Sequence, residues 1–208
     1  MYKIFRCLPV FFAIFCVVIS GNANECLSYK IKPKIVIDVP SYTKKVTQSE
    51  TLMDLMHGNV VATLVNNYDI VADVKPFGHG YCVWLKSVNA TIGYNDFSVQ
   101  IDAQHDVDSC SYNAILSHEN KHIDAYLSVI QDNKKLLHES LYSASDSVMP
   151  IFVNSQQDID DAVEKMNNTL QTHPDVVLAI QKIHGDEEIK NKNIDANEDN
   201  HELNKCME

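Results

Sequence analysis

The stretch from residue 111 to residue 149 constrains the fold more than any other part of the sequence, because it contains neither Gly nor Pro. Its apolar residues recur at the spacing of one helix face, for example at Ile123, Leu127 and Ile130. This period is typical of an amphipathic helix that lies against a core. We therefore predict a long helix that begins near Ser111 and runs to about Ser143, or breaks once on the way.

The sequence before this helix has the composition of strands and turns. Residues 59–94 are rich in Val, Ile and aromatic side chains, and Tyr29–Val39 alternates between apolar and polar positions. Residues 88–92 and 97–103 also alternate, and the segment 94–96 between them contains the turn formers Asn and Asp. Such alternation predicts half-buried strands, so we expect these two segments to form a hairpin.

Shorter helices are predicted on both sides of this region. Asp158–Leu170 is amphipathic, residues 176–183 continue at helical spacing, and Ser49–Met56 could form a short helix. The expected fold class is α+β, with an N-terminal, mainly antiparallel sheet packed against two or three helices. We expect a single domain over residues 24–183, followed by an acidic, flexible tail over residues 184–208.

The first 23 residues have the layout of a secretory signal peptide. Lys3 and Arg6 give a basic start, Leu8–Ile19 is almost entirely apolar, and Gly21-Asn22-Ala23 offers small residues to a signal peptidase. The apolar segment is shorter than the about 20 residues that a membrane-spanning helix needs. The sequence thus predicts cleavage after Ala23, a secreted or periplasmic location, and no stable membrane insertion after cleavage.

The charge balance argues against two classes of partner, nucleic acids and anionic lipid surfaces. The formal net charge is −11, and much of the acidity lies from Asp186 onward. Nucleic-acid binding needs a basic face that neutralises phosphates, and adsorption to anionic lipid needs one too. We expect neither.

The cysteines predict disulfide bonds. Cys7 and Cys16 would leave with the signal peptide, and an even number remains in an exported chain. Four cysteines allow three pairings, and one bridge plus free thiols is the alternative. We expect Cys82–Cys110, because both residues flank the segment that leads into the long helix, and Cys26–Cys206, which would join the two ends.

One motif in the long helix carries chemistry. His118-Glu119-Asn120-Lys121-His122 has the form H-E-x-x-H, and four-residue spacing places both imidazoles on one helix face. Zinc is the expected occupant, because it is a tetrahedral ion that accepts imidazole and leaves a position open for water. Glu119 would act as a general base. The alternative is an exposed helix face on which Glu119 pairs with Lys121 or another cation.

The order strand, strand, H-E-x-x-H helix and second helix resembles the core of the zincin metallopeptidases. The stretch from Ser109 to His122 is also similar to uncharacterised bacterial secreted proteins predicted to be zinc-dependent proteases, and this likeness covers residues 82–130. The resemblance implies a zincin-like fold and a zinc-dependent attack of water on a peptide bond. It also implies that Phe97–Ala103 is the edge strand that binds the substrate.

The chain departs from the zincin subfamilies at the third metal ligand. Ala125 and Ser128 stand where a metzincin would have Gly and His, and the N-E-x-x-S-D and G-T-x-D patterns are absent. Tyr126, one turn beyond His122, could orient a ligand, stabilise an oxyanion or simply pack in the core. The third ligand is therefore unassigned, and the candidates are Glu139, Asp158, Asp161, Glu164 and His105.

The function expected from the sequence is that of a secreted or periplasmic zinc peptidase that acts on a peptide or protein substrate. The metal ligands would be His118 and His122, and the catalytic base would be Glu119. The alternative is a non-catalytic binding or structural module of the cell envelope that retains a zincin-like scaffold.

Overall fold

The computed structural model describes residues 25–50, 57–197 and 205–206. The chain divides into two compact units, each built from three stretches of sequence. Of the described residues, the first unit contains 25–36, 68–89 and 141–176, and the second contains 37–50, 57–67, 90–140, 177–197 and 205–206. The units interleave along the chain. The predicted signal peptide (residues 1–23) and most of the predicted helix Ser49–Met56 lie outside the described residues.

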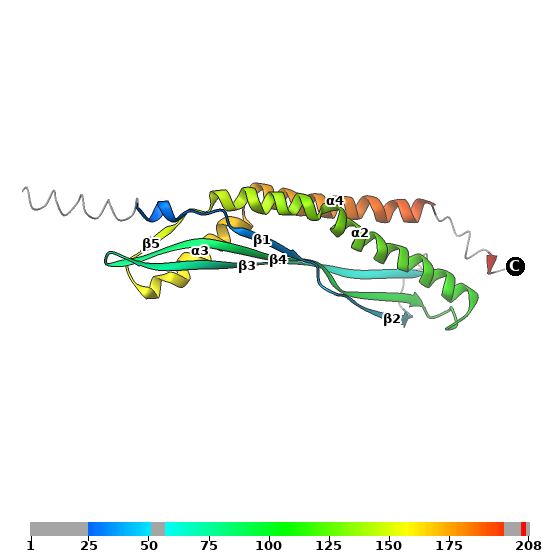
Figure 1. Cartoon of the computed structure of the whole chain (residues 1–208). Coiled ribbons are helices and arrows are strands. Elements are labelled where there is room, and N and C mark those ends of the chain that lie inside the picture. Colours follow the sequence, from blue (N-terminus) through cyan, green and yellow to red (C-terminus); the bar gives the residue numbers. More distant parts are fainter. Residues whose placement is uncertain (1–24, 51–56, 198–204, 207–208) are drawn as a thin grey trace, which may run out of the picture. The chain divides into compact units, whose positions relative to one another are not determined.

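The architecture is α+β, as the sequence predicts (Figure 1). Strands dominate the first half of the described chain and helices the second half. In chain order the elements are the 3-10 helix η1 (Leu27–Tyr29), β1 (Lys34–Asp38), β2 (Thr43–Ser49), β3 (Gly58–Phe77), β4 (Gly80–Asp102), α2 (Cys110–Ser147), β5 (Ile151–Val153), the 3-10 helix η2 (Gln156–Asp158), α3 (Ile159–Gln171) and α4 (Pro174–Asn197).

Strand β4 organises the sheet, because each of the other four strands pairs with it. β2 runs parallel to β4, with Thr43 opposite Asp96 and Ser49 opposite Asp102. β5 pairs with β4 in the antiparallel direction. A mainly antiparallel sheet is thus not confirmed. The whole of β3 separates β2 from β4 in the sequence, and a connection of that length allows a parallel pair.

The predicted hairpin around residues 94–96 is wrong, because β4 passes through this segment without a turn. Tyr94 and Phe97 are both buried, and burial of these aromatic rings outweighs the turn preference of the residues between them. Asp96 accepts a hydrogen bond of 3.0 Å from the Thr43 hydroxyl on β2. Gly93 has φ = 150°, and a Cβ atom there would lie 2.9 Å from Pro40 Cδ. Only glycine meets both requirements without strain.

The helices extend further than the sequence predicts. α2 confirms the long helix and reaches Ser147, and α3 confirms the second helix. α4 continues to Asn197, so residues 184–197 are helical where a tail is expected. The reason is that α4 lies antiparallel to α2 here: Lys190 Nζ lies 2.7 Å from Asp132 Oδ2, and Asn133 Nδ2 donates to Asp186 Oδ2. Among the described residues, no helix is long and apolar enough to cross a membrane.

Two disulfide bonds are present, but both expected pairings are wrong. Cys26 bonds to Cys82, and Cys110 bonds to Cys206. Each bond joins two residues of the same unit. The expected Cys82–Cys110 bond does not form, because Cys82 and Cys110 belong to different units.

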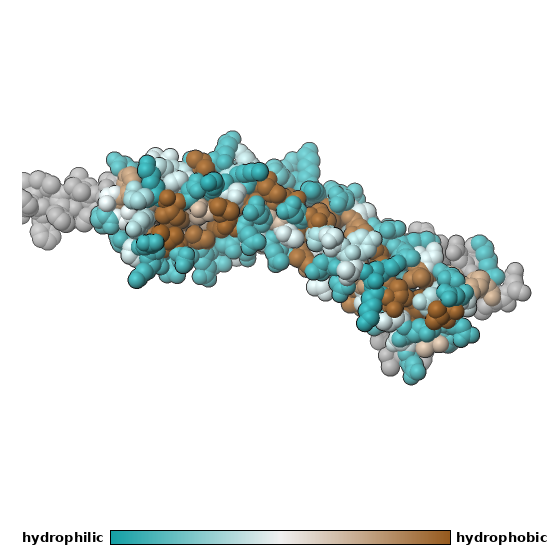
Figure 2. All heavy atoms as spheres, turned by 60° about the horizontal axis from the view of Figure 1, so that its bottom comes forward, coloured by the Kyte–Doolittle hydropathy of each residue, from teal (hydrophilic) through white to brown (hydrophobic). Residues whose placement is uncertain are grey.

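Hydrophilic residues cover most of the face shown in Figure 2, and hydrophobic residues gather there in separate groups.

Candidate metal centre

Three side chains of the second unit converge on one point, and two of them come from the H-E-x-x-H motif. The Nε2 atoms of His118 and His122 lie 3.1 Å apart, because residues four apart on α2 project from the same face. Asp195 Oδ1, on α4, lies 3.4 Å from His118 Nε2 and 3.1 Å from His122 Nε2. Within the described ranges this is the one group of three or more His, Cys, Asp or Glu residues with metal-binding spacing.

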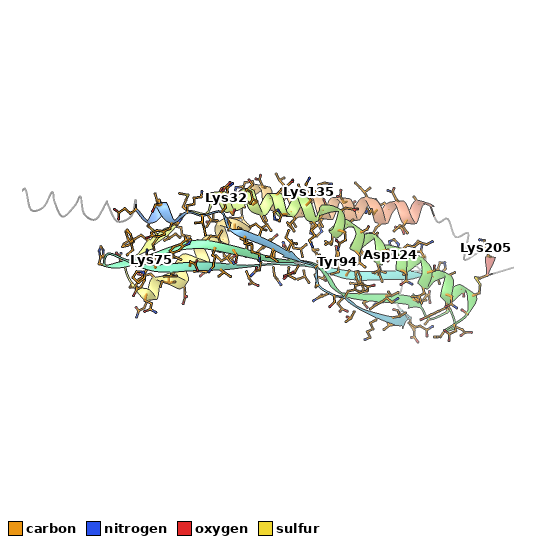
Figure 3. The ribbon with its side chains drawn as sticks, viewed as in Figure 1. Lys32, Lys75, Tyr94, Asp124, Lys135 and Lys205 are labelled. Atoms are coloured by element: carbon orange, nitrogen blue, oxygen red, sulfur yellow. A yellow bond between two sulfur atoms is a disulfide. The ribbon has the colours of Figure 1, made fainter. Side chains whose placement is uncertain are left out.

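The third member of the group differs from the candidates taken from the sequence. Glu139 is exposed on α2 and forms an i,i+4 pair with Lys135, which Figure 3 labels. His105 lies in the connection before α2, where its Nδ1 is 3.1 Å from Ser111 Oγ and its Nε2 is 3.3 Å from His57 Nδ1. Neither residue belongs to the group with His118 and His122.

The three acidic candidates near α3 are also outside the group. Asp158 accepts hydrogen bonds from the backbone N–H and the hydroxyl of Ser155, in a capping box. Asp161 and Glu164 are exposed on α3. All three belong to the first unit. The described structure therefore places none of the five candidates with His118 and His122, and it places Asp195 there instead.

A periodic signal for Asp195 is present in the sequence. Glu187, Asn191 and Asp195 recur every four residues, which places them on one face of α4. All three make polar contacts: Glu187 accepts a short hydrogen bond from the Tyr94 hydroxyl on β4, and the other two face His122. Figure 3 labels Tyr94 on the ribbon. The sequence after Gly185 is acidic, as flexible tails often are, so its composition predicted a tail and the helical repeat was not used.

Asn191 orients the His122 ring. His122 Nδ1 lies 2.8 Å from Asn191 Oδ1, an oxygen that only accepts. Nδ1 therefore donates to Asn191, and the ring is turned so that Nε2 faces His118 and Asp195. Outer-shell hydrogen bonds of this kind fix the tautomer that a metal requires. Tyr126, which is half-buried, also hydrogen-bonds to Asn191, and its ring packs on Tyr94.

The carboxyl group of Glu119 is buried next to this group. Only 4% of the residue is exposed. Burial raises the pKa of the Glu119 carboxyl and the Asp195 charge raises it further, while the nearby His122 and His118 lower it. A carboxylate with a raised pKa is a stronger base than one that water solvates, so it takes up a proton more readily.

Gly58, the first residue of β3, provides the space for this carboxyl group. A Cβ atom at position 58 would lie 2.4 Å from Glu119 Oε1 and 2.6 Å from Ile115 Cγ2. Real side chains do not approach this closely, so the Glu119 side chain would have to move. The glycine is thus part of the site through its lack of a side chain.

The Gly58→Ala variant is expected to be destabilised by about 1–3 kcal/mol, the usual cost of overpacking, because the Glu119 and Ile115 side chains would have to move. Gly185→Ala is the matched control, because nothing lies within 4 Å of a Cβ atom there. In a helix interior this second change is expected to stabilise the protein by roughly 0.5–1 kcal/mol. Urea unfolding measures both, and equal stability of the two variants would contradict this view of Gly58.

The predicted substrate-binding edge is occupied by neighbouring strands. Residues 96–102 of β4 pair with β2 on one side. Near the end of β4, Asp102 N donates to His57 O, just before β3 begins. Phe97–Ala103 is therefore not an open edge, and this expectation is wrong.

Comparison with known proteins finds no relative: no family model, no curated protein and no solved structure matches the chain. The zincin resemblance therefore stays a prediction. The evidence for a function is therefore the group formed by His118, His122 and Asp195, with the Glu119 carboxyl beside it.

Proposed function

We propose that this protein is a zinc-dependent peptidase that works outside the cytoplasm. The observation that carries the proposal is the convergence of two imidazoles and the Asp195 carboxylate beside the buried carboxyl of Glu119. The predicted signal peptide supports an exported protein. The two disulfide bonds support it as well, because such bonds persist in oxidising compartments.

The donor set fits zinc. Two histidine nitrogens and one carboxylate oxygen are a common ligand set of catalytic zinc sites, which keep a fourth position open. His118, His122 and Asp195 would hold the ion. A zinc ion bound there would supply a Lewis acid that polarises a carbonyl group and makes water more acidic.

Glu119 would act as the general base and then as the general acid. It directly follows His118 on α2, and its carboxyl group lies against Gly58 with little access to solvent. In this position it would take the proton of the attacking water and pass it to the leaving amine, a role worth about 10²–10⁴-fold in rate. The buried location also keeps bulk water from competing for that proton.

The strand that begins beside Glu119 offers a place for an extended substrate. Among the strands that the structure describes, β3 pairs with β4 alone. Its second edge therefore presents backbone N–H and C=O groups, which can pair with a peptide chain as an added strand. We therefore propose that the substrate binds along β3, and not along Phe97–Ala103 as the zincin resemblance implies.

A peptide-library digest tests the proposal. The zinc-loaded protein is incubated with a mixture of synthetic peptides, and new termini are identified by mass spectrometry. We expect cleavage that stops on chelation of zinc and returns when zinc is added back. If the protein binds zinc but cleaves no peptide, the peptidase proposal fails, and a non-catalytic envelope module becomes the better description.

A further inference from the structure

The end of α4 that carries Asp195 is weakly anchored. Ile183 and Glu187 are buried in the second unit, but none of residues 188–196 is. Asp195 lies two residues before the end of the helix, and 62% of its side chain is exposed. Helix ends with few buried contacts open locally at low cost in free energy. The third metal ligand is therefore placed on the least stable part of α4.

Polar contacts are the main support of this segment. Lys190 Nζ bonds to Asp132 Oδ2 at 2.7 Å and to Ser128 Oγ at 2.8 Å. Both Lys190 and Asp132 are partly open to solvent, and exposed ion pairs contribute only about 0–1 kcal/mol. Asn191 adds its hydrogen bond to His122. Partly exposed contacts of this kind add little stability to the last turn of α4 beyond what holds the rest of the helix on α2.

A covalent bond restrains the same region. Cys110, the first residue of α2, is eight residues before His118, and it is bonded to Cys206, which is eleven residues after Asp195. We infer that the Cys110–Cys206 disulfide positions Asp195 at the metal site and so sets the affinity for zinc. The bond keeps the chain after Asp195 attached to the helix that carries both histidines, which raises the local concentration of the third ligand. This inference rests on the metal site of the proposed function.

The two disulfides differ in their exposure to reductants. Cys26 and Cys82 are 1% and 0% exposed, whereas Cys110 is exposed and Cys206 is half-buried. A dithiol reductant would therefore reach Cys110–Cys206 first. In that exchange a reductant thiolate attacks one sulfur, and the second reductant thiol then closes the reductant disulfide. The protein gains two electrons and two protons as two thiols. The affinity for zinc would thus depend on the redox state of this bond.

The test compares two disulfide variants of the full chain by titration against a chromophoric zinc chelator. The Cys110→Ser/Cys206→Ser variant is expected to bind zinc about 10-fold more weakly than the wild type, the scale of a lost outer-shell partner. The matched control, Cys26→Ser/Cys82→Ser, keeps the wild-type affinity. Wild-type protein that is briefly reduced with a dithiol, alkylated and freed of reductant provides the same comparison without substitutions.

A double-mutant cycle separates positioning from general stability. In an Asp195→Ala background, removal of the Cys110–Cys206 bond should cause no further loss of affinity, because the ligand that it positions is gone. Additive losses, or an unchanged affinity in both the serine variant and the alkylated protein, would overturn the inference and leave the metal site intact. A wild-type protein that binds no zinc would overturn the metal site itself.

Discussion

Glu119→Gln is expected to abolish peptide hydrolysis while zinc remains bound. Glutamine keeps the size of the side chain, so it fits the space beside Gly58 and leaves the ligands His118 and His122 in place. Its amide cannot take a proton from water, so the rate should fall by about 10²–10⁴-fold. The measurement is the rate of peptide cleavage, together with the zinc content of the same preparation.

Glu139→Gln is the matched control for this change. Glu139 is on the same helix, but it is exposed, and it pairs with Lys135 at 3.8 Å rather than with the histidines. We expect cleavage at the wild-type rate. If Glu119→Gln retained full activity with zinc bound, Glu119 would not be the base, and the assignment of its role would have to be abandoned.

Asp195→Ala is expected to weaken zinc binding strongly, since it removes one of the three proposed ligands. The loss should exceed the roughly 10–100-fold that an outer-shell substitution costs. Asp161→Ala is the control, because Asp161 is an exposed residue of α3 and does not belong to the metal group. The dissociation constants come from chelator competition.

Equal affinities of the Asp195→Ala protein and the wild type would show that Asp195 is not a ligand. The candidates from the sequence would then have to be tested in turn. An equally large loss on Asp161→Ala would contradict the site described here in a different way, because it would place a ligand on α3.

The half of the site that is local in sequence could be predicted, and the half that depends on tertiary contacts could not. The spacing of His118 and His122 within a helical pattern was enough to bring their nitrogens together. Asp195 is 73 residues beyond His122, and it joins the site only because α4 folds back along α2. No local pattern encodes that packing, although the repeat of Glu187, Asn191 and Asp195 was a usable sign of a continuing helix.

The sheet and the disulfides were missed for a related reason. Asn95 and Asp96 prefer turns, but the burial of Tyr94 and Phe97 favours a continuous β4 strand through this segment. The pairing of the cysteines depends on which segments share a unit, and the units interleave along the chain. The long helix α2 was easier to predict, because Gly and Pro are absent from the whole of it. The continuation of α4 over residues 184–197 was missed.

The zinc-to-protein ratio of the purified full chain tests the central claim most directly. The two imidazoles of His118 and His122 and the Asp195 carboxylate predict one zinc ion per chain in the wild type and in Glu119→Gln. They predict none in His118→Ala/His122→Ala. A wild-type protein that stays metal-free after incubation with zinc, or a double alanine variant that still holds one ion per chain, would contradict the account.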